Sequence, residues 1–153
     1  LHRLIRRQRQ MCIRDRNTRY KALKSEFAFD ESVRLSDNSN VLKISATVGM
    51  QYPEITENVK AVFLEGFHSG TLNTDGKALN DFCQKAKEMN IPVFLTGACK
   101  GFYYESKLKF DGLNIKVLPP ASPIAMYIKL WLLPKSEFDK AFLPCAEDFY
   151  DND

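Results

Sequence analysis

The hydrophobic and polar positions of this chain follow two different periods after residue 40. Short apolar runs, alternating or continuous, end at glycine, proline or asparagine, as strands do. The run Ala61-Val62-Phe63-Leu64 is continuous, which is typical of a strand covered on both faces. The pattern predicts strands at 41–48, 59–66, 91–98 and 115–118.

Between and after these runs, apolar residues recur at spacings of three and four, the period of an amphipathic helix. The longest such segment predicts a helix at 74–89, with Asn73 or Thr74 as its N-cap. Ser122 and Pro123 are typical of a helix start, and Pro134 ends the apolar segment that follows them. The expected helices therefore lie at 74–89, 105–110, 123–133 and 135–142.

This order of elements predicts an α/β fold, an open Rossmann-like sheet of three layers. We expect about four mostly parallel strands with helices on both faces, because helical crossovers between strands are nearly always right-handed. Ligands of such sheets bind beyond the carboxyl ends of the strands. The two loops 66–71 and 96–101 are expected at that edge.

The net charge of +3 is concentrated at the start of the chain. Residues 1–16 hold six arginines and one acid, so residues 17–153 keep 16 basic and 18 acidic residues and a net charge of −2. The arm is either a disordered tail, a surface that binds nucleic acid or membrane, or non-native sequence of the kind translated at the ends of gene fragments. We favour the third interpretation, and expect no nucleic-acid or membrane partner.

The remaining chain divides into three segments. We expect an interdomain linker remnant at 17–40, one α/β domain at 41–146 and an acidic tail at 147–153. No run of apolar residues approaches the ~20 that a membrane span needs.

Few residues of the chain are typical of catalytic chemistry. The cysteines are widely spaced, so we expect buried free thiols and neither a zinc site nor any other metal or cofactor. His68, Ser69 and Thr71 lie in a glycine-rich loop ahead of a helix, where backbone amides favour a carboxylate ligand. A tight turn without function explains the same residues, and the helix dipole alone explains Glu105.

Several motifs, taken in order, resemble one family. Residues 59–71 (VKAVFLEGFHSGT) resemble the start of the C-terminal domain core of the bacterial L-asparaginase/glutaminase family. Residues 41–53, 91–96 and 104–112 resemble the segments around it. The helix from Ser122 to Leu130, which ends in Lys-Leu, resembles the closing segment of that domain. The loop at His68 is similar to that of the cytoplasmic-type branch.

The resemblance implies an amidohydrolase that converts asparagine to aspartate and ammonia in the cytoplasm, as a homo-oligomer and without a cofactor. It also implies that the nucleophilic threonine belongs to an N-terminal catalytic domain, whose motifs are absent from this chain. We therefore expect this fragment alone to be inactive, with no catalytic residue of its own. His68, Ser69, Thr71 and Glu105 are its candidate substrate-binding residues.

Two other functions fit the same motifs. The domain also occurs in a subunit of a tRNA-dependent amidotransferase, which delivers ammonia. A module that binds an amino acid without any chemistry is the third interpretation.

Overall fold

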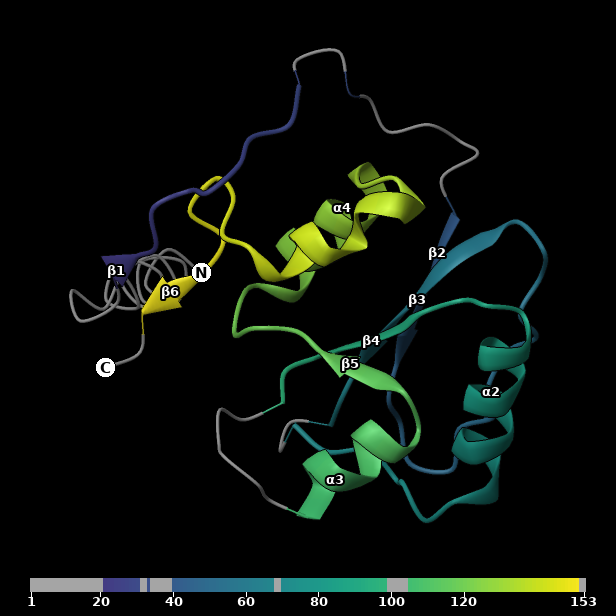
Figure 1. Ribbon diagram of the computed structural model, residues 1–153. Helices are drawn as coiled ribbons and strands as arrows, with labels where there is room; N and C mark the ends of the chain where they lie inside the picture. The colour runs from purple at the N-terminus through teal and green to yellow at the C-terminus, as the bar shows by residue number, and fades with distance from the viewer. Residues whose placement is uncertain (1–20, 31–32, 34–39, 68–69, 99–104, 152–153) are drawn as a thin grey trace, which may run out of the picture.

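Four parallel strands form the central sheet (Figure 1). The computed structural model describes residues 21–30, 33, 40–67, 70–98 and 105–151. Each strand pairs in parallel with the next one along the chain, so chain order and spatial order coincide. The strands are β2 (Asn40–Ser45), β3 (Val59–Glu65), β4 (Val93–Thr96) and β5 (Ile115–Val117). The predicted α/β fold with a parallel sheet is confirmed.

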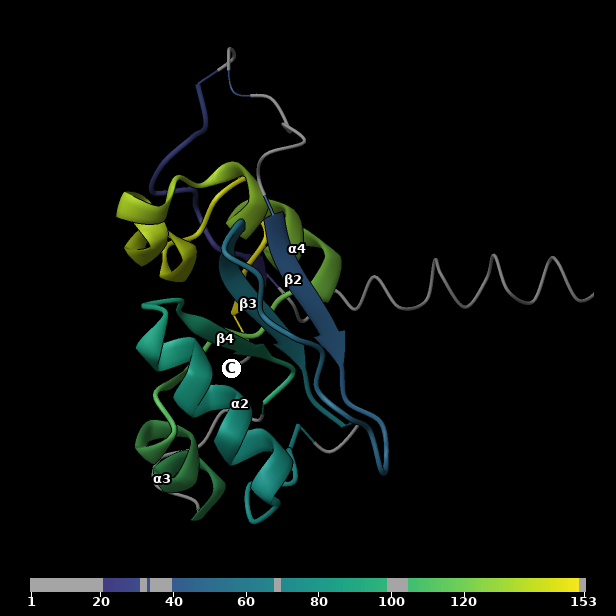
Figure 2. The same ribbon diagram turned by 90° about the vertical axis from the view of Figure 1, so that its right-hand side faces the viewer.

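Helices cover both faces of this sheet (Figure 2). Helices α2 (Lys77–Glu88) and α3 (Glu105–Gly112) pack on one face, because right-handed crossovers between strands laid down in one direction fall on the same side. Helix α4 (Pro123–Leu132) and the 3₁₀ helix η1 (Lys135–Phe142) pack on the other face. Within the described residues, no helix has the length and apolar character to cross a membrane.

The side chains of β3 divide between two hydrophobic cores. Val62 and Leu64 belong to the core beneath α2 and α3, whereas Ala61 and Phe63 belong to the core beneath α4 and η1. All four are at most 1% exposed, as expected of a strand buried on both faces. The continuous apolar run in the sequence is thus explained by two cores that share one strand.

The two largest errors in the predicted boundaries are three residues each. The strand predicted to reach residue 48 ends at Ser45, because the chain turns there and leaves Val48 95% exposed. The helix predicted to start at residue 74 begins at Lys77, with Gly76 as the N-cap and no side-chain capping hydrogen bond. The side chain of Asn80 donates to the carbonyl oxygens of Thr74 and Gly76, at 3.0 and 2.9 Å, and so holds the preceding residues in a turn.

Of the two helices predicted near the C-terminus, the first is confirmed and the second is a 3₁₀ helix. Ser122 is the N-cap of α4 and Pro123 its first residue, as predicted, although the Ser122 hydroxyl makes no capping hydrogen bond. The segment predicted as a helix after Pro134 is the 3₁₀ helix η1, interrupted at Glu137, where φ is −117°.

The segment expected as an acidic tail packs against the domain. Strand β6 (Tyr150–Asp151) pairs antiparallel with β1 (Lys21–Ala22), a short strand within the expected linker. The backbone N–H of Leu23 donates to the carbonyl oxygen of Phe149 at 2.9 Å, and the Phe149 ring is buried in the core beneath α4. The two ends of the described chain therefore lie side by side (Figure 1).

A buried ion pair links this segment to α4. The Nζ of Lys129 lies 2.7 Å from Oδ2 of Asp148, and the two side chains are only 3% and 8% exposed. The same ammonium donates to the carbonyl oxygen of Leu143 and lies 4.3 Å from the ring centroid of Phe149. A buried charge is tolerated only when it is paired and hydrogen-bonded, and these groups satisfy that condition.

Removing one partner of this pair should destabilise the protein strongly. We expect Asp148→Asn to lower the free energy of unfolding by about 3–5 kcal/mol, since it leaves the Lys129 ammonium buried without a counter-charge. Urea denaturation followed by circular dichroism measures this change. Lys140→Gln removes the solvent-exposed pair of Lys140 with Glu137 and should cost less than about 1 kcal/mol. Equal effects of the two substitutions would contradict the prediction.

Candidate functional site

A cavity of about 270 Å³ opens at the carboxyl edge of the sheet, on the side of α2. The loop that leaves β2 contributes residues 46–50 and Tyr52. The loop that leaves β3 contributes Phe67, Leu72 and Asn73, and the first turn of α2 closes the remaining side. Carboxyl edges of parallel sheets are where ligands usually bind, so this cavity is the first candidate site.

Three polar residues end adjacent strands at the same edge. Glu65 is the register partner of both Ser45 and Thr96, so the three residues form a row across β2, β3 and β4. The hydroxyl of Ser45 donates to Oε2 of Glu65 at 2.7 Å, and the Nζ of Lys43 lies 3.5 Å from the same oxygen. This row faces α4, because the Lys43 ammonium also lies 6.0 Å from the ring centroid of Tyr127. The row is therefore on the opposite face of the sheet from the cavity, and none of its three residues lines that cavity.

Thr96 stands out in this row. Its side chain is fully buried, and its hydroxyl has no hydrogen-bond partner among the residues that the structure describes. A buried hydroxyl without a partner costs roughly 1–3 kcal/mol, so polar groups of this kind usually meet another polar group. Thr96 is also the first residue of the loop 96–101, which is expected at the edge where ligands bind.

Backbone hydrogen bonds close a turn between Phe67 and Thr71, after β3. The N–H of Phe67 donates to the carbonyl oxygen of Thr71 at 2.9 Å, and the N–H of Gly70 donates to that of Phe67 at 2.7 Å. Gly70 has φ +73°, a conformation that favours glycine. A Cβ on Gly66 would lie 3.1 Å from the carbonyl oxygen of Thr71. Both glycines are therefore explained by the turn itself.

The predicted substrate-binding residues are only partly visible. Thr71 is half-buried at the carboxyl edge, where it was predicted to lie. Glu105 is the first residue of α3, but its side chain falls outside the described part of the structure, as do His68 and Ser69 entirely. Thr71 is not among the residues that line the cavity, and the substrate-binding role of all four residues stays a prediction.

Tyr52 is the residue of this site that sequence reasoning missed. It lines the cavity, and its ring packs on Phe82 of α2 with the centroids 4.9 Å apart. Burial raises the pKa of the Tyr52 phenol, and the nearby Cys83 thiol raises it further. The Tyr52-Pro53 dipeptide after a glycine turn was the available signal, but it indicates a turn more directly than a ligand contact.

The prediction of buried free thiols is confirmed for the two cysteines that the structure describes. Cys83 and Cys145 are buried and free. Burial raises the pKa of Cys83 to about 11 and also raises that of Cys145. Neither thiol is therefore an activated nucleophile at neutral pH.

No described group of three or more histidine, cysteine, aspartate or glutamate side chains is arranged to hold a metal ion.

Comparisons with family models, with curated proteins and with solved structures find no match for the chain. The resemblance to the asparaginase family therefore stays a prediction carried by the sequence motifs.

The loop geometry predicts opposite effects at two glycines. Gly66→Ala should destabilise the protein by about 1–3 kcal/mol, because the new methyl group crowds a backbone carbonyl that cannot move aside easily. Gly112→Ala, in α3 and with no atom within 4 Å of the new Cβ, should be neutral or stabilise by up to about 1 kcal/mol. Thermal unfolding measures both variants, and a Gly66→Ala protein as stable as wild type would refute the close approach.

The raised pKa of Cys83 predicts a loss of stability at high pH. Between about pH 9 and 11 the unfolded chain gives up the thiol proton while the folded chain keeps it, so the free energy of unfolding falls. We expect a contribution of about 1–2 kcal/mol after allowance for solvent screening. Urea denaturation at pH 8 and pH 10.5 measures the fall, and Cys83→Ala should reduce it. An unchanged fall in that variant would assign it to other groups, such as Tyr52.

Proposed function

We propose that this chain supplies the C-terminal domain of an asparaginase-type amidohydrolase and helps to bind L-asparagine at the carboxyl edge of its sheet. The observation that carries the proposal is the polar row of Ser45, Glu65 and Thr96, which ends three adjacent strands beside the loops with asparaginase-like motifs. An α/β sheet of this kind binds ligands at that edge.

The chemistry of the edge suits a small amino acid. An amino acid presents an ammonium group, which needs acceptors, and a carboxylate, which needs donors. Glu65 offers a half-buried carboxylate as the acceptor, and the half-buried Thr71 offers a hydroxyl as a donor. His68, Ser69 and Glu105 belong to the same proposal through the resemblance.

The chemistry of the reaction explains which role the proposal gives to each domain. In asparaginase-type hydrolysis a threonine hydroxyl attacks the side-chain amide, ammonia leaves, and water then releases the acyl-enzyme. The proposal places that threonine in a separate N-terminal domain and gives this domain substrate binding alone. It also includes a homo-oligomer and a cytoplasmic location, since both are implied by the resemblance.

The proposal predicts binding without turnover by the chain itself. Purified residues 1–153 should release no ammonia from L-asparagine. Titration with L-asparagine should shift the amide NMR signals of 45–50, 65–72 and 96, and leave those of 87–92 unchanged.

A matched pair of threonine variants sharpens the test. Thr71→Val removes a hydroxyl at the carboxyl edge and should weaken binding by about tenfold, which corresponds to one hydrogen bond to a charged group. Thr56→Val removes a hydroxyl from the opposite edge, where it is 2.5 Å from Oδ1 of Asn58, and should leave binding unchanged. Ammonia release by the chain alone, or shifts confined to another surface, would refute the proposal.

A further inference from the structure

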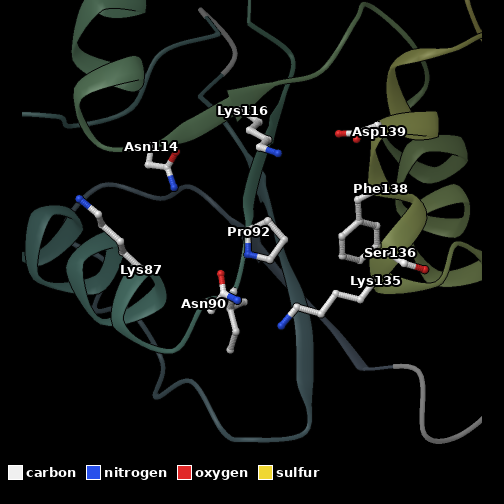
Figure 3. A pocket seen from close by; sticks show the side chains of 10 residues that line it. Lys87, Asn90, Pro92, Asn114, Lys116, Lys135, Ser136, Phe138 and Asp139 are labelled. Atoms are coloured by element: carbon white, nitrogen blue, oxygen red, sulfur yellow. The ribbon is translucent and has the colours of Figure 1, made fainter.

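A second cavity, of about 390 Å³, lies at the amino edge of the sheet, opposite to the candidate site (Figure 3). The turns that lead into β4 and β5 form its floor, through Pro92 and Asn114. Lys87 at the end of α2 and Lys135 at the start of η1 stand on either side of it. We call this cavity the amino-edge cleft.

The amino-edge cleft is rich in unpaired positive charge. Lys87, Lys116 and Lys135 line it from three different elements, whereas Asp139 is the one acid among its ten lining residues. None of these three lysines forms an ion pair with a described residue. Four lysines elsewhere in the described structure do form such pairs: Lys43, Lys109, Lys129 and Lys140.

Local structure explains part of this lining. Asn90 and Asn114 each follow a helix and have φ values of 55° and 56°, a conformation that asparagine tolerates well. Lys87 lies in the last turn of α2, where the helix dipole favours a cation. Lysine is also common at exposed positions of edge strands such as that of Lys116, so Lys135 is the lysine of the cleft that local structure does not explain.

Lys116 is exposed and lies next to an aromatic residue of the core. It lies on β5, an edge strand, and its Nζ is 5.9 Å from the ring centroid of Phe94, which is fully buried beneath η1. The ammonium group therefore sits over a hydrophobic core at the mouth of the cleft, on the opposite side of Pro92 from Lys135 (Figure 3). The Lys116 side chain is exposed, so its ammonium group is accessible to an anion at the mouth of the cleft.

We propose that the amino-edge cleft binds a small organic anion that carries at least two carboxylate or phosphate groups. We expect two anionic groups because the three lysines line the cleft from three different elements (Figure 3). The amides of Asn90 and Asn114 and the hydroxyl of Ser136 supply additional donors. The volume is in the range of metabolite sites, about 300–1,000 Å³.

The cleft is independent of the candidate site. It lies at the amino ends of the strands, and the substrate proposal uses only groups at the carboxyl ends. Failure of either proposal therefore leaves the other intact.

Calorimetric titration of the full chain with citrate and with inorganic pyrophosphate tests the proposal, with acetate as the anion of single charge. We expect citrate, pyrophosphate or both to bind, and acetate to bind at least tenfold more weakly. Lys116→Gln and Lys135→Gln should each raise the Kd by about tenfold, the loss of one charge-assisted hydrogen bond. Binding of only one anion assigns the cleft to carboxylates or to phosphates.

Lys87 and Lys85 provide the matched control. Both lie in the last turn of α2 and both are exposed, but only Lys87 lines the cleft. Lys87→Gln should weaken binding and Lys85→Gln should not, at equal change in net charge. An equal loss in both variants, equal affinity for acetate, or no binding of either polyanion at millimolar concentration would overturn the proposal. Circular dichroism confirms that the variants are folded.

Discussion

Strand β3 is buried on both faces, and this burial sets the arrangement of the elements around it. Its central side chains are almost fully buried, so each face of the sheet needs a layer of helices to exclude water. Because β3 is also parallel to both neighbours, every connection must cross back over the sheet. All loops that leave the strands consequently gather at one edge, and all turns that enter them gather at the other.

The two candidate sites follow from this separation of edges. The carboxyl edge collects glycine-rich loops, hydroxyls and a carboxylate, whereas the amino edge collects the ends of helices and their lysines. Residues at either edge are not packed inside a hydrophobic core. The stability of the protein therefore constrains their identity less than it constrains the identity of core residues. The ion pair of Lys129 and Asp148 is different, because both of its charged side chains are buried. Each charge is stable there only because the other neutralises it.

Sequence reasoning predicted the elements well and the site only in part. Apolar periodicity located all four strands of the sheet and the helices around it, because it depends on residues a few positions apart. It misplaced the start of α2 by three residues, in the turn where the Asn80 side chain donates to the carbonyl oxygens of Thr74 and Gly76. It also interpreted residues 147–153 as a tail, because the partner of Asp148 lies in α4, well upstream in the chain.

Local patterns in the sequence predicted the four strands of the central sheet, the helices that cover it and the parallel topology, but not strand β6. Only the tertiary structure decided the register that aligns Ser45, Glu65 and Thr96, and the approach of three lysines from separate elements to one cleft. The physical reason is the range of the interactions concerned. Periodicity and turn chemistry are local, whereas register, ion pairing and cavities arise between residues that only packing brings together.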